Sequence, residues 1–454
     1  MSRHVHDADV IVVGGGPAGS TAASWLARAG HRVVLFERDR FPRFHIGESL
    51  LASVNDPLGA IGADDLVRRM GFPQKWGATF MSADGNVERY ADFGVAPDVR
   101  TPQTWQVPRA TFDELLLRHS AESGADVRQR HRVLDVAFDA DGVTAIVQEA
   151  GADDRDPAND AAAKPYHVHA KAIVDASGRG SVLSRKFGLR MDEPRLANIA
   201  VFSHYSGVPR QDGRRSGDIR IVARQDLGWF WLIPISDQLM SVGVVMPRGD
   251  FQKAFCGVEH AAALDQAIAQ TPAVARLLAG ARREWPVRVE KDFSFGSRAY
   301  AGDRWVLVGD AGSFLDPVFS TGVAIALESG LEAAQAIGDG LTRGDLSVRQ
   351  FARFARRQRR RYFSFRRFVL GFYTPEFRDL FFSEDPPPRM FRSLVTVFAG
   401  YWHPSLVTRA WVWLFFLLVR AQRWLHFAPR LVAKRQTDAE PVAATEEHVS
   451  LGQG

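Results

Sequence analysis

The amino-acid sequence predicts an α/β fold, and three observations lead to that class. Residues 9–36 follow the pattern of a strand, a helix and a second strand, with a glycine-rich turn after the first strand. Several segments between residues 198 and 246 alternate or run apolar as strands do. From residue 323 onward the apolar spacing is helical. We therefore expect a βαβ domain with a central parallel or mixed sheet, a second domain with an antiparallel sheet, and a helical C-terminal module.

The expected elements follow from local patterns. The central sheet should contain buried strands at 9–13, 32–36, 172–175 and 305–308, with a helix at 17–29. The antiparallel sheet should contain strands at 198–204, 218–223, 229–235 and 240–246. Two polar segments interrupt this pattern. We interpret 150–165 as a flexible hairpin tip or insertion and 436–454 as a disordered tail.

Length and composition limit the class of protein further. The 454 residues exceed what one hydrophobic core usually supports, so two or more packed domains are expected. One cysteine, Cys256, excludes a disulfide framework and a cysteine-rich zinc site, and we predict no metal site. No apolar run precedes the first strand, so we expect a cytoplasmic enzyme. The apolar stretch 406–419 is interrupted by Arg409 and is shorter than the ~20 residues that cross a bilayer, which indicates a core or interfacial helix.

The net charge of +5 conceals a strong asymmetry. Residues 350–435 contain 17 Lys and Arg but only 4 Asp and Glu, a net charge of +13, so the rest of the chain carries −8. Such a basic module suits an acidic protein partner or an anionic membrane surface. No nucleic-acid-binding motif accompanies it, so we expect no nucleic-acid partner.

A glycine loop lies between the first strand and the first helix. Gly14, Gly16 and Gly19 give the spacing GxGxxG, in which the first glycine permits a tight turn, the second admits a pyrophosphate and the third lets the helix pack on the strand. Glu37 ends the second strand, 18 residues after Gly19, where a carboxylate accepts the ribose hydroxyls. The loop predicts a dinucleotide site but does not separate FAD from NAD.

Two later stretches favour FAD. Residues 305–311, WVLVGDA, are similar to the segment of flavoprotein hydroxylases in which an aspartate, here Asp310, contacts the flavin ribitol. Residues 174–185, VDASGRGSVLSR, resemble the central motif of the same class. The expected division then assigns 1–80, 109–190 and 296–345 to the FAD-binding domain, 81–108 and 191–295 to the substrate domain, 346–435 to the basic, aromatic C-terminal module and 436–454 to the tail.

Four stretches make the resemblance specific. They are FPRFHIGESLL at 41–51, FPQKWGATF at 72–80, GWFWLIPI at 228–235 and FLDPVFSTG at 314–322. With these motifs the chain resembles the flavin-dependent halogenases over residues 8–335, in particular the branch that acts on phenols and carrier-tethered pyrroles. It lacks the glutamate pattern typical of tryptophan halogenases, so activation of the substrate by a general base is not implied.

The resemblance implies a division of roles. Reduced FAD, O2 and chloride or bromide yield hypohalous acid, which Lys75 hydrogen-bonds or captures and directs at an electron-rich ring. The backbone N–H groups of Thr321 and Gly322 hold the halide at the start of a helix. Trp229 and Trp231 keep bulky substrates away from the flavin. The other implied residues are Ala18, Arg38, Glu48, Ser49 and Arg109 for the cofactor, and Phe314, Pro317 and Ser320 for the lining of the active site.

Each role has a simpler alternative. Lys75 could be a solvated surface lysine, Arg109 a surface salt bridge, and the two tryptophans core aromatics on one face of a strand. We do not assign His45, which lies in the stretch 41–51, as a catalytic base. The whole chain could instead be a flavin monooxygenase, a geranylgeranyl-reductase-like enzyme, or a flavoprotein scaffold without activity.

The expected partners follow from what the chain does and does not contain. No second glycine fingerprint for NAD(P)H follows the first, so reduced FAD should come from a separate flavin reductase. The aromatic substrate is free or tethered to an acyl or peptidyl carrier protein. The C-terminal module packs on the body with a solvated basic face, docks a carrier, or contacts a membrane peripherally.

Overall fold

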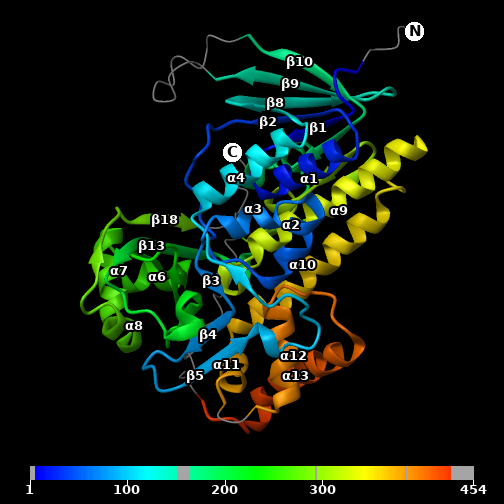
Figure 1. Cartoon of the computed structure of the whole chain (residues 1–454). Helices are drawn as coiled ribbons and strands as arrows, with labels where there is room; N and C mark the ends of the chain where they lie inside the picture. Colours follow the sequence, from blue (N-terminus) through cyan, green and yellow to red (C-terminus); the bar gives the residue numbers. More distant parts are fainter. Residues whose placement is uncertain (1–5, 151–163, 292–293, 384–385, 431–454) are drawn as a thin grey trace, which may run out of the picture.

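The computed structural model describes residues 6–150, 164–291, 294–383 and 386–430. It confirms the expected α/β class: two large sheets lie on either side of a helical layer, and the C-terminal helices close the lower end of the molecule (Figure 1). The predicted tail at 436–454 and most of the predicted hairpin tip at 150–165 lie outside the described residues. The strands on either side of that tip do pair as a hairpin.

The central sheet is mixed, and among the described residues it has the strand order β20-β21-β11-β1-β2-β7. All neighbours are parallel except β20 and β21. Its strands are β1 (Val10–Val13), β2 (Val33–Glu37), β7 (Asp126–Gln129), β11 (Ala172–Asp175), β20 (Ala301–Gly302) and β21 (Trp305–Leu307). The predicted strands therefore fall within one or two residues of those observed, because β-branched, fully buried runs mark them clearly.

Helices cover one face of this sheet. Val10, Val12, Leu35 and Val174 pack on that side against α1 and α9. The helices on this side are α1 (Pro17–Arg28), α2 (Asn55–Ile61), α3 (Asp64–Arg69), α4 (Arg109–Glu122) and α9 (Thr321–Arg343). The short helix α5 (Val182–Lys186) packs on the other side. Helix α9 begins two residues before the predicted start at 323.

A small antiparallel sheet, which the sequence patterns did not predict, covers the other face. It has the order β10-β9-β8 and packs on the alternate side chains Ile11, Val13, Val34 and Phe36. Its strands are β8 (His131–Phe138), β9 (Val143–Glu149) and β10 (Tyr166–Ala170), at the top of Figure 1.

The second large sheet contains the four strands predicted between 198 and 246. Its order is β17-β13-β16-β15-β14-β4-β5, with β18 also paired to β13. The sheet is not wholly antiparallel as expected: β14 and β4 run parallel, because β4 arrives from an early part of the chain and spans the boundary expected at residue 80. Its strands are β4 (Gly77–Met81), β5 (Glu88–Asp92), β13 (Asn198–Ser206), β14 (Ile219–Ala223), β15 (Trp229–Pro234), β16 (Leu239–Pro247), β17 (Arg282–Arg283) and β18 (Arg288–Lys291).

The two faces of this sheet have different neighbours. One face packs on α6 (Arg248–Ala254), α7 (His260–Ala269) and α8 (Pro272–Leu277). The other carries Phe202, Trp229 and Trp231 and belongs to the largest core, which it shares with the C-terminal helices. Two short pairs complete the strands: β3 (Gln74–Lys75) with β6 (Thr104–Trp105), and β12 (Arg190–Asp192) with β19 (Phe295–Ser297).

The C-terminal module is helical, as predicted. It consists of α10 (Ala352–Phe372), α11 (Pro375–Phe381), α12 (Pro388–Phe398) and α13 (Leu406–Leu425). Two of its arginines are structural and buried. Arg361 pairs with Glu328 and Glu332, and Arg378 donates to backbone carbonyls of the turn between β14 and β15. In the described ranges no helix combines the length and apolar character needed to span a bilayer.

Candidate active site

One cavity of about 670 Å³ brings most of the predicted site residues together. This volume lies within the ~300–1,000 Å³ that is usual for cofactor and ligand pockets. Its walls include the predicted residues Gly14, Gly16, Ala18, Glu37, Arg38, Glu48, Ser49, Arg109, Trp229, Trp231, Asp310, Phe314, Pro317, Ser320 and Gly322. Gly19, Lys75 and Thr321 are not among the residues that line it, and each lies beside one that does.

The glycine loop has the geometry that a pyrophosphate requires. Gly14 has a φ of 101°, a conformation that suits glycine, and its N–H donates to the Phe36 carbonyl at 2.7 Å. A Cβ on Gly19 would lie 1.8 Å from the Gly14 carbonyl oxygen, so only glycine allows α1 to approach the loop so closely. Gly16 caps α1 without a side chain, which leaves the first N–H groups of that helix facing the cavity.

Two acidic residues of the cavity wall could accept hydrogen bonds from the sugar and ribitol hydroxyls of FAD. The Glu37 carboxylate accepts the backbone N–H groups of Gly15 (2.6 Å) and Asp39 (2.8 Å) and still has lone pairs to accept a ribose hydroxyl. Burial raises the pKa of Glu37, and it raises the pKa of Asp310 to about 6. The cavity, the uncapped helix start and the two carboxyl groups together fit an FAD molecule.

Arg109 begins α4, and its side chain forms hydrogen bonds with other residues of the protein. The side chain is buried, pairs with both carboxylate oxygens of Asp113 (2.8 and 2.9 Å) and donates to the Ile46 carbonyl at 2.7 Å. The alternative of a surface salt bridge is wrong because the pair is buried. Arg109 lines the cavity and fixes the loop at residues 41–51, which we call the strap loop.

Lys75 is held behind the strap loop. It is 1% exposed, and its Nζ donates to Ser49 Oγ at 2.9 Å and to the Leu50 carbonyl at 2.7 Å. Burial lowers the pKa of Lys75 to about 7, although the Asp218 carboxylate opposes that shift. The alternative of a solvated lysine is therefore wrong, since a buried amine with a lowered pKa is characteristic of reactive sites.

Backbone pairing explains the position of Lys75. Strand β3 pairs with β6, and β6 is linked to the strap loop by hydrogen bonds from Leu50 N–H to the Trp105 carbonyl (3.1 Å) and from Val107 N–H to the Glu48 carbonyl (2.7 Å). The lysine side chain crosses this layer toward Ser49, a residue of the cavity wall. Lys75 is thus separated from the cavity by the strap loop alone.

The predicted halide loop leads into α9. Ser320 has a φ of 55° at the N-cap, and α9 starts at Thr321 and runs for 23 residues. The N–H groups of Thr321 and Gly322 are therefore at the positive end of a long helix dipole. Gly322 lines the cavity, where a Cβ would meet the Phe314 ring at 3.1 Å. This turn has the backbone donors that an anion needs.

Trp229 and Trp231 lie next to each other on the cavity wall. Their ring centroids are 5.9 Å apart, and both side chains are buried on the same face of β15. Trp231 is opposite Gly243, where a Cβ would come within 2.3 Å of its ring. The tryptophans are part of the core and also line the cavity. Their interpretation as core aromatics and their interpretation as active-site residues therefore do not exclude each other.

A hydrogen-bonded chain that the sequence analysis missed joins Trp229 to the halide loop. Trp229 Nε1 donates to Tyr373 Oη (2.8 Å), and the Tyr373 hydroxyl donates to Asp316 Oδ2 (2.7 Å), which also accepts from Asn198 (2.7 Å). Burial raises the pKa of Asp316 to about 6. Asp316 lies inside the quoted stretch 314–322, but Tyr373 lies on α10, where no local pattern distinguishes it.

We expect Tyr373→Phe to loosen this wall. Removing the hydroxyl leaves the buried Trp229 N–H without its acceptor and costs about 1–3 kcal/mol of stability. Thermal unfolding should show this loss, and halogenation should fall several-fold as Trp229 shifts. Tyr166→Phe, on the remote strand β10, removes a hydroxyl that accepts one long hydrogen bond from Arg128 (3.3 Å) at a partly exposed site. It should leave halogenation unchanged and cost less stability than Tyr373→Phe. Equal stability and activity of the two variants would show that the chain of hydrogen bonds is unimportant.

Three histidines lie near the site, and one of them, His131 at the start of β8, lines the cavity. His45 lines the cavity, and burial together with nearby Arg109 lowers its pKa to about 4, so it is neutral near pH 7 and poorly suited to act as a base. His204 was not singled out from the sequence; it is buried on β13, and its Nε2 lies 3.6 Å from Glu48 Oε1.

Comparisons with known proteins agree with this geometry. A family model described as an FAD binding domain matches residues 7–347. The chain is similar to the 1H-pyrrole-2-carbonyl peptidyl-carrier protein chlorinase of Pseudomonas fluorescens, at 31% identity, covering 85% of this chain and 88% of the chlorinase. It is similar to the corresponding brominase of Pseudoalteromonas luteoviolacea, at 34% identity, covering 74% of this chain and 79% of the brominase.

A solved structure supports the same class. The chain is similar to the myxobacterial chondrochloren halogenase, at 34% identity and a TM-score of 0.73, covering 91% of this chain and 97% of that one. The FAD-binding fold and the site thus define a flavoprotein oxidoreductase. Within that class, the chain belongs to the flavin-dependent halogenases. It is an enzyme that uses FAD and a halide, which removes the scaffold alternative and favours halogenation over monooxygenation.

Proposed function

We propose that this enzyme chlorinates or brominates an electron-rich ring, phenolic or pyrrole-like, that is attached to an acyl or peptidyl carrier protein. The observation that supports it best is Lys75, a buried amine separated from the cavity by the strap loop alone. The carrier is suggested by the two relatives whose names specify a pyrrole on a peptidyl-carrier protein.

The reaction balances in two steps. Reduced FAD, O2, a halide ion and a proton give oxidised FAD, hypohalous acid and water. O2 takes up four electrons in this step, two from the flavin and two from the halide. An aromatic C–H and hypohalous acid then give a C–halogen bond and water.

The protein provides the surroundings for both steps. The N–H groups of Thr321 and Gly322 hold the anion at the positive end of α9. Trp229 and Trp231 fill the space beside the cofactor, so that the oxidant and not the ring occupies it. Lys75 hydrogen-bonds the oxidant on the far side of the strap loop and orients its halogen toward the ring.

Two partners complete the proposal. A separate flavin reductase would supply reduced FAD. Helix α10 offers a surface for an acidic carrier because its exposed face carries Arg353, Arg356, Arg359 and Arg360. Arginines of this kind steer an acidic partner and raise the rate of association, and the effect weakens with salt.

Product analysis tests the function. The enzyme, with a flavin reductase, NADPH, O2 and bromide, is given a pyrrole carboxylate or a phenolic acid, each free and loaded on a carrier protein. We expect brominated product that requires both bromide and reduced FAD, with the carrier-loaded ring preferred. An oxygenated product in the presence of bromide, or reduction of the bound FAD by NADPH without the reductase, would support the monooxygenase or reductase alternative instead.

A further inference from the structure

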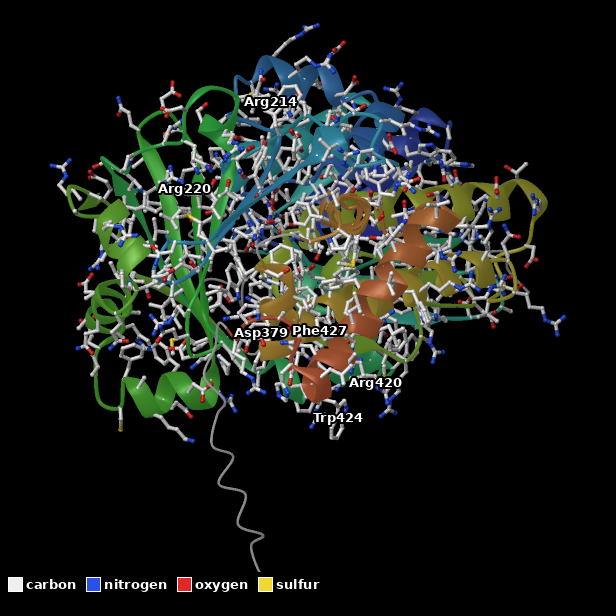
Figure 2. The ribbon with its side chains drawn as sticks, turned by 90° about the horizontal axis from the view of Figure 1, so that it is seen from below. Arg214, Arg220, Asp379, Arg420, Trp424 and Phe427 are labelled. Carbon is white, nitrogen blue, oxygen red and sulfur yellow. The ribbon has the colours of Figure 1, made fainter. Side chains whose placement is uncertain are left out.

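Helix α13 exposes an unusual number of large apolar side chains. Leu406, Trp413 and Trp424 are 78%, 59% and 74% exposed. Other exposed apolar residues on the helix or just after it are Val407, Leu417, Leu425 and Phe427. Figure 2 shows Trp424 at the outer end of this helix, projecting away from the body. Solvent-exposed patches of this kind mark interaction surfaces.

The exposed residues share one face. Leu406, Trp413, Leu417 and Trp424 are separated by seven, four and seven residues, the spacing of a single stripe along a helix. At 1.5 Å per residue, the two tryptophans lie ~16 Å apart along that stripe. Indole rings prefer the boundary between water and an apolar phase.

The charges beside the stripe have one sign. Exposed arginines at 409, 420 and 423 lie along one of its edges, and the sequence contains no Asp or Glu between residues 406 and 430. Arg420 and Trp424 emerge from the same end of the helix in Figure 2. The surface is therefore complementary to an apolar layer with an anionic boundary.

The opposite face of α13 is anchored to the protein. Thr408 Oγ1 donates to Asp98 at 2.6 Å near the first turn, and Phe415 and Phe416 are buried in the core. At the other end, the Gln422 side chain bonds both the N–H and the carbonyl of Ala428, at 3.0 and 2.8 Å. The stripe is thus presented on a fixed helix, which would lie along a surface and not across it.

We propose that α13 lies in the interface of an anionic lipid bilayer, with Trp413 and Trp424 inserted and the three arginines at the headgroups. A second copy of this chain is a less suitable partner for α13 than a bilayer, because the arginines of the two copies would face and repel each other. An acidic carrier would match the arginines but not the row of exposed aliphatic and indole side chains. The proposal is independent of the substrate proposed above.

Vesicle sedimentation of the full-length, FAD-loaded enzyme tests this contact. We expect it to sediment with vesicles of phosphatidylcholine and phosphatidylglycerol, and to bind at least ~10-fold less to phosphatidylcholine alone or in high salt. Trp413→Gln combined with Trp424→Gln should lower binding at least ~10-fold and leave halogenation of a free substrate unchanged. Leu134→Gln combined with Val348→Gln, which removes exposed apolar side chains elsewhere, should bind like the wild type.

Three results would overturn the proposal. One is equal sedimentation with and without the anionic lipid. A second is a concentration-dependent dimer, seen by light scattering, that the tryptophan variant loses while neither protein binds vesicles. A third is binding of an acidic carrier protein that the tryptophan variant loses, again without vesicle binding.

Discussion

Replacing Lys75 by methionine should lower the rate of halogenation by at least ~100-fold while FAD remains bound, because loss of one hydrogen-bond donor to the reacting group costs on the order of 10²–10³ in rate. Methionine has a similar length and tolerates burial, so the strap loop should keep its place. Turnover is measured as halogenated product per oxidised flavin, and FAD binding by flavin absorbance. Lys253→Met, at an exposed position on α6, should behave like the wild type.

The fate of hypohalous acid in this variant shows whether Lys75 guides the oxidant to the substrate or takes part in forming it. In Lys75→Met we expect reduced FAD and halide to be consumed at the normal rate, with hypohalous acid escaping to a small halogen acceptor in solution. Wild-type rates of substrate halogenation in this variant would contradict the role assigned to Lys75. Loss of halide oxidation as well would place Lys75 in the first step instead.

The pH profile tests which form of Lys75 acts. A neutral amine has two N–H bonds, and Ser49 and Leu50 would accept both, whereas the ammonium ion keeps a third for hypohalous acid. Because the pKa is about 7, lysine is charged below that pH and neutral above it. We therefore expect kcat for halogenation to fall as pH rises through about 7. If kcat instead rises over the same pH range, the neutral amine of Lys75 is the active form, and its lone pair captures the halogen.

Local sequence patterns predicted the parts of the fold that depend on local physics. The βαβ unit and the strands around Trp229 have continuous buried runs bounded by turns, and they were placed nearly residue by residue. The β8–β10 sheet was not predicted. Outward-facing apolar residues such as Leu134 and Ile146, and an irregularity in β8 between Val133 and Asp135, obscure the alternation in the sequence. The parallel pairing of β4 with β14 joins segments ~140 residues apart in sequence, which no periodicity reveals.

In the site, too, the sequence predicted what local motifs encode and not what depends on contacts between distant residues. Motifs identified Lys75 and the turn at Thr321, whereas the burial of Lys75 behind the strap loop is seen only in the structure. The sequence did not show that Arg109 would pair with Asp113 and hold the strap loop, because that depends on side-chain geometry. Tyr373 is the clearest case: it reaches Trp229 from another module, and nothing near it in the sequence indicates that contact.

Gly19→Ala should abolish FAD binding. The new Cβ would lie 1.8 Å from the Gly14 carbonyl oxygen, a backbone atom, and 3.2 Å from the Ala176 side chain. Helix α1 must then move away from β1, which shifts the N–H groups that face the pyrophosphate. Overpacking of this kind costs about 1–3 kcal/mol or more, so the apoprotein should also unfold at a lower temperature.

The measurement is the flavin absorbance per protein chain after purification, followed by titration of the apoprotein with FAD. Gly249→Ala is the matched control, because its Cβ would meet nothing within 4 Å in α6, where alanine favours the helix. That variant should keep FAD and unfold at or slightly above the wild-type temperature. If Gly19→Ala bound FAD with wild-type affinity, the close approach of α1 to the glycine loop would not be what creates the cofactor site.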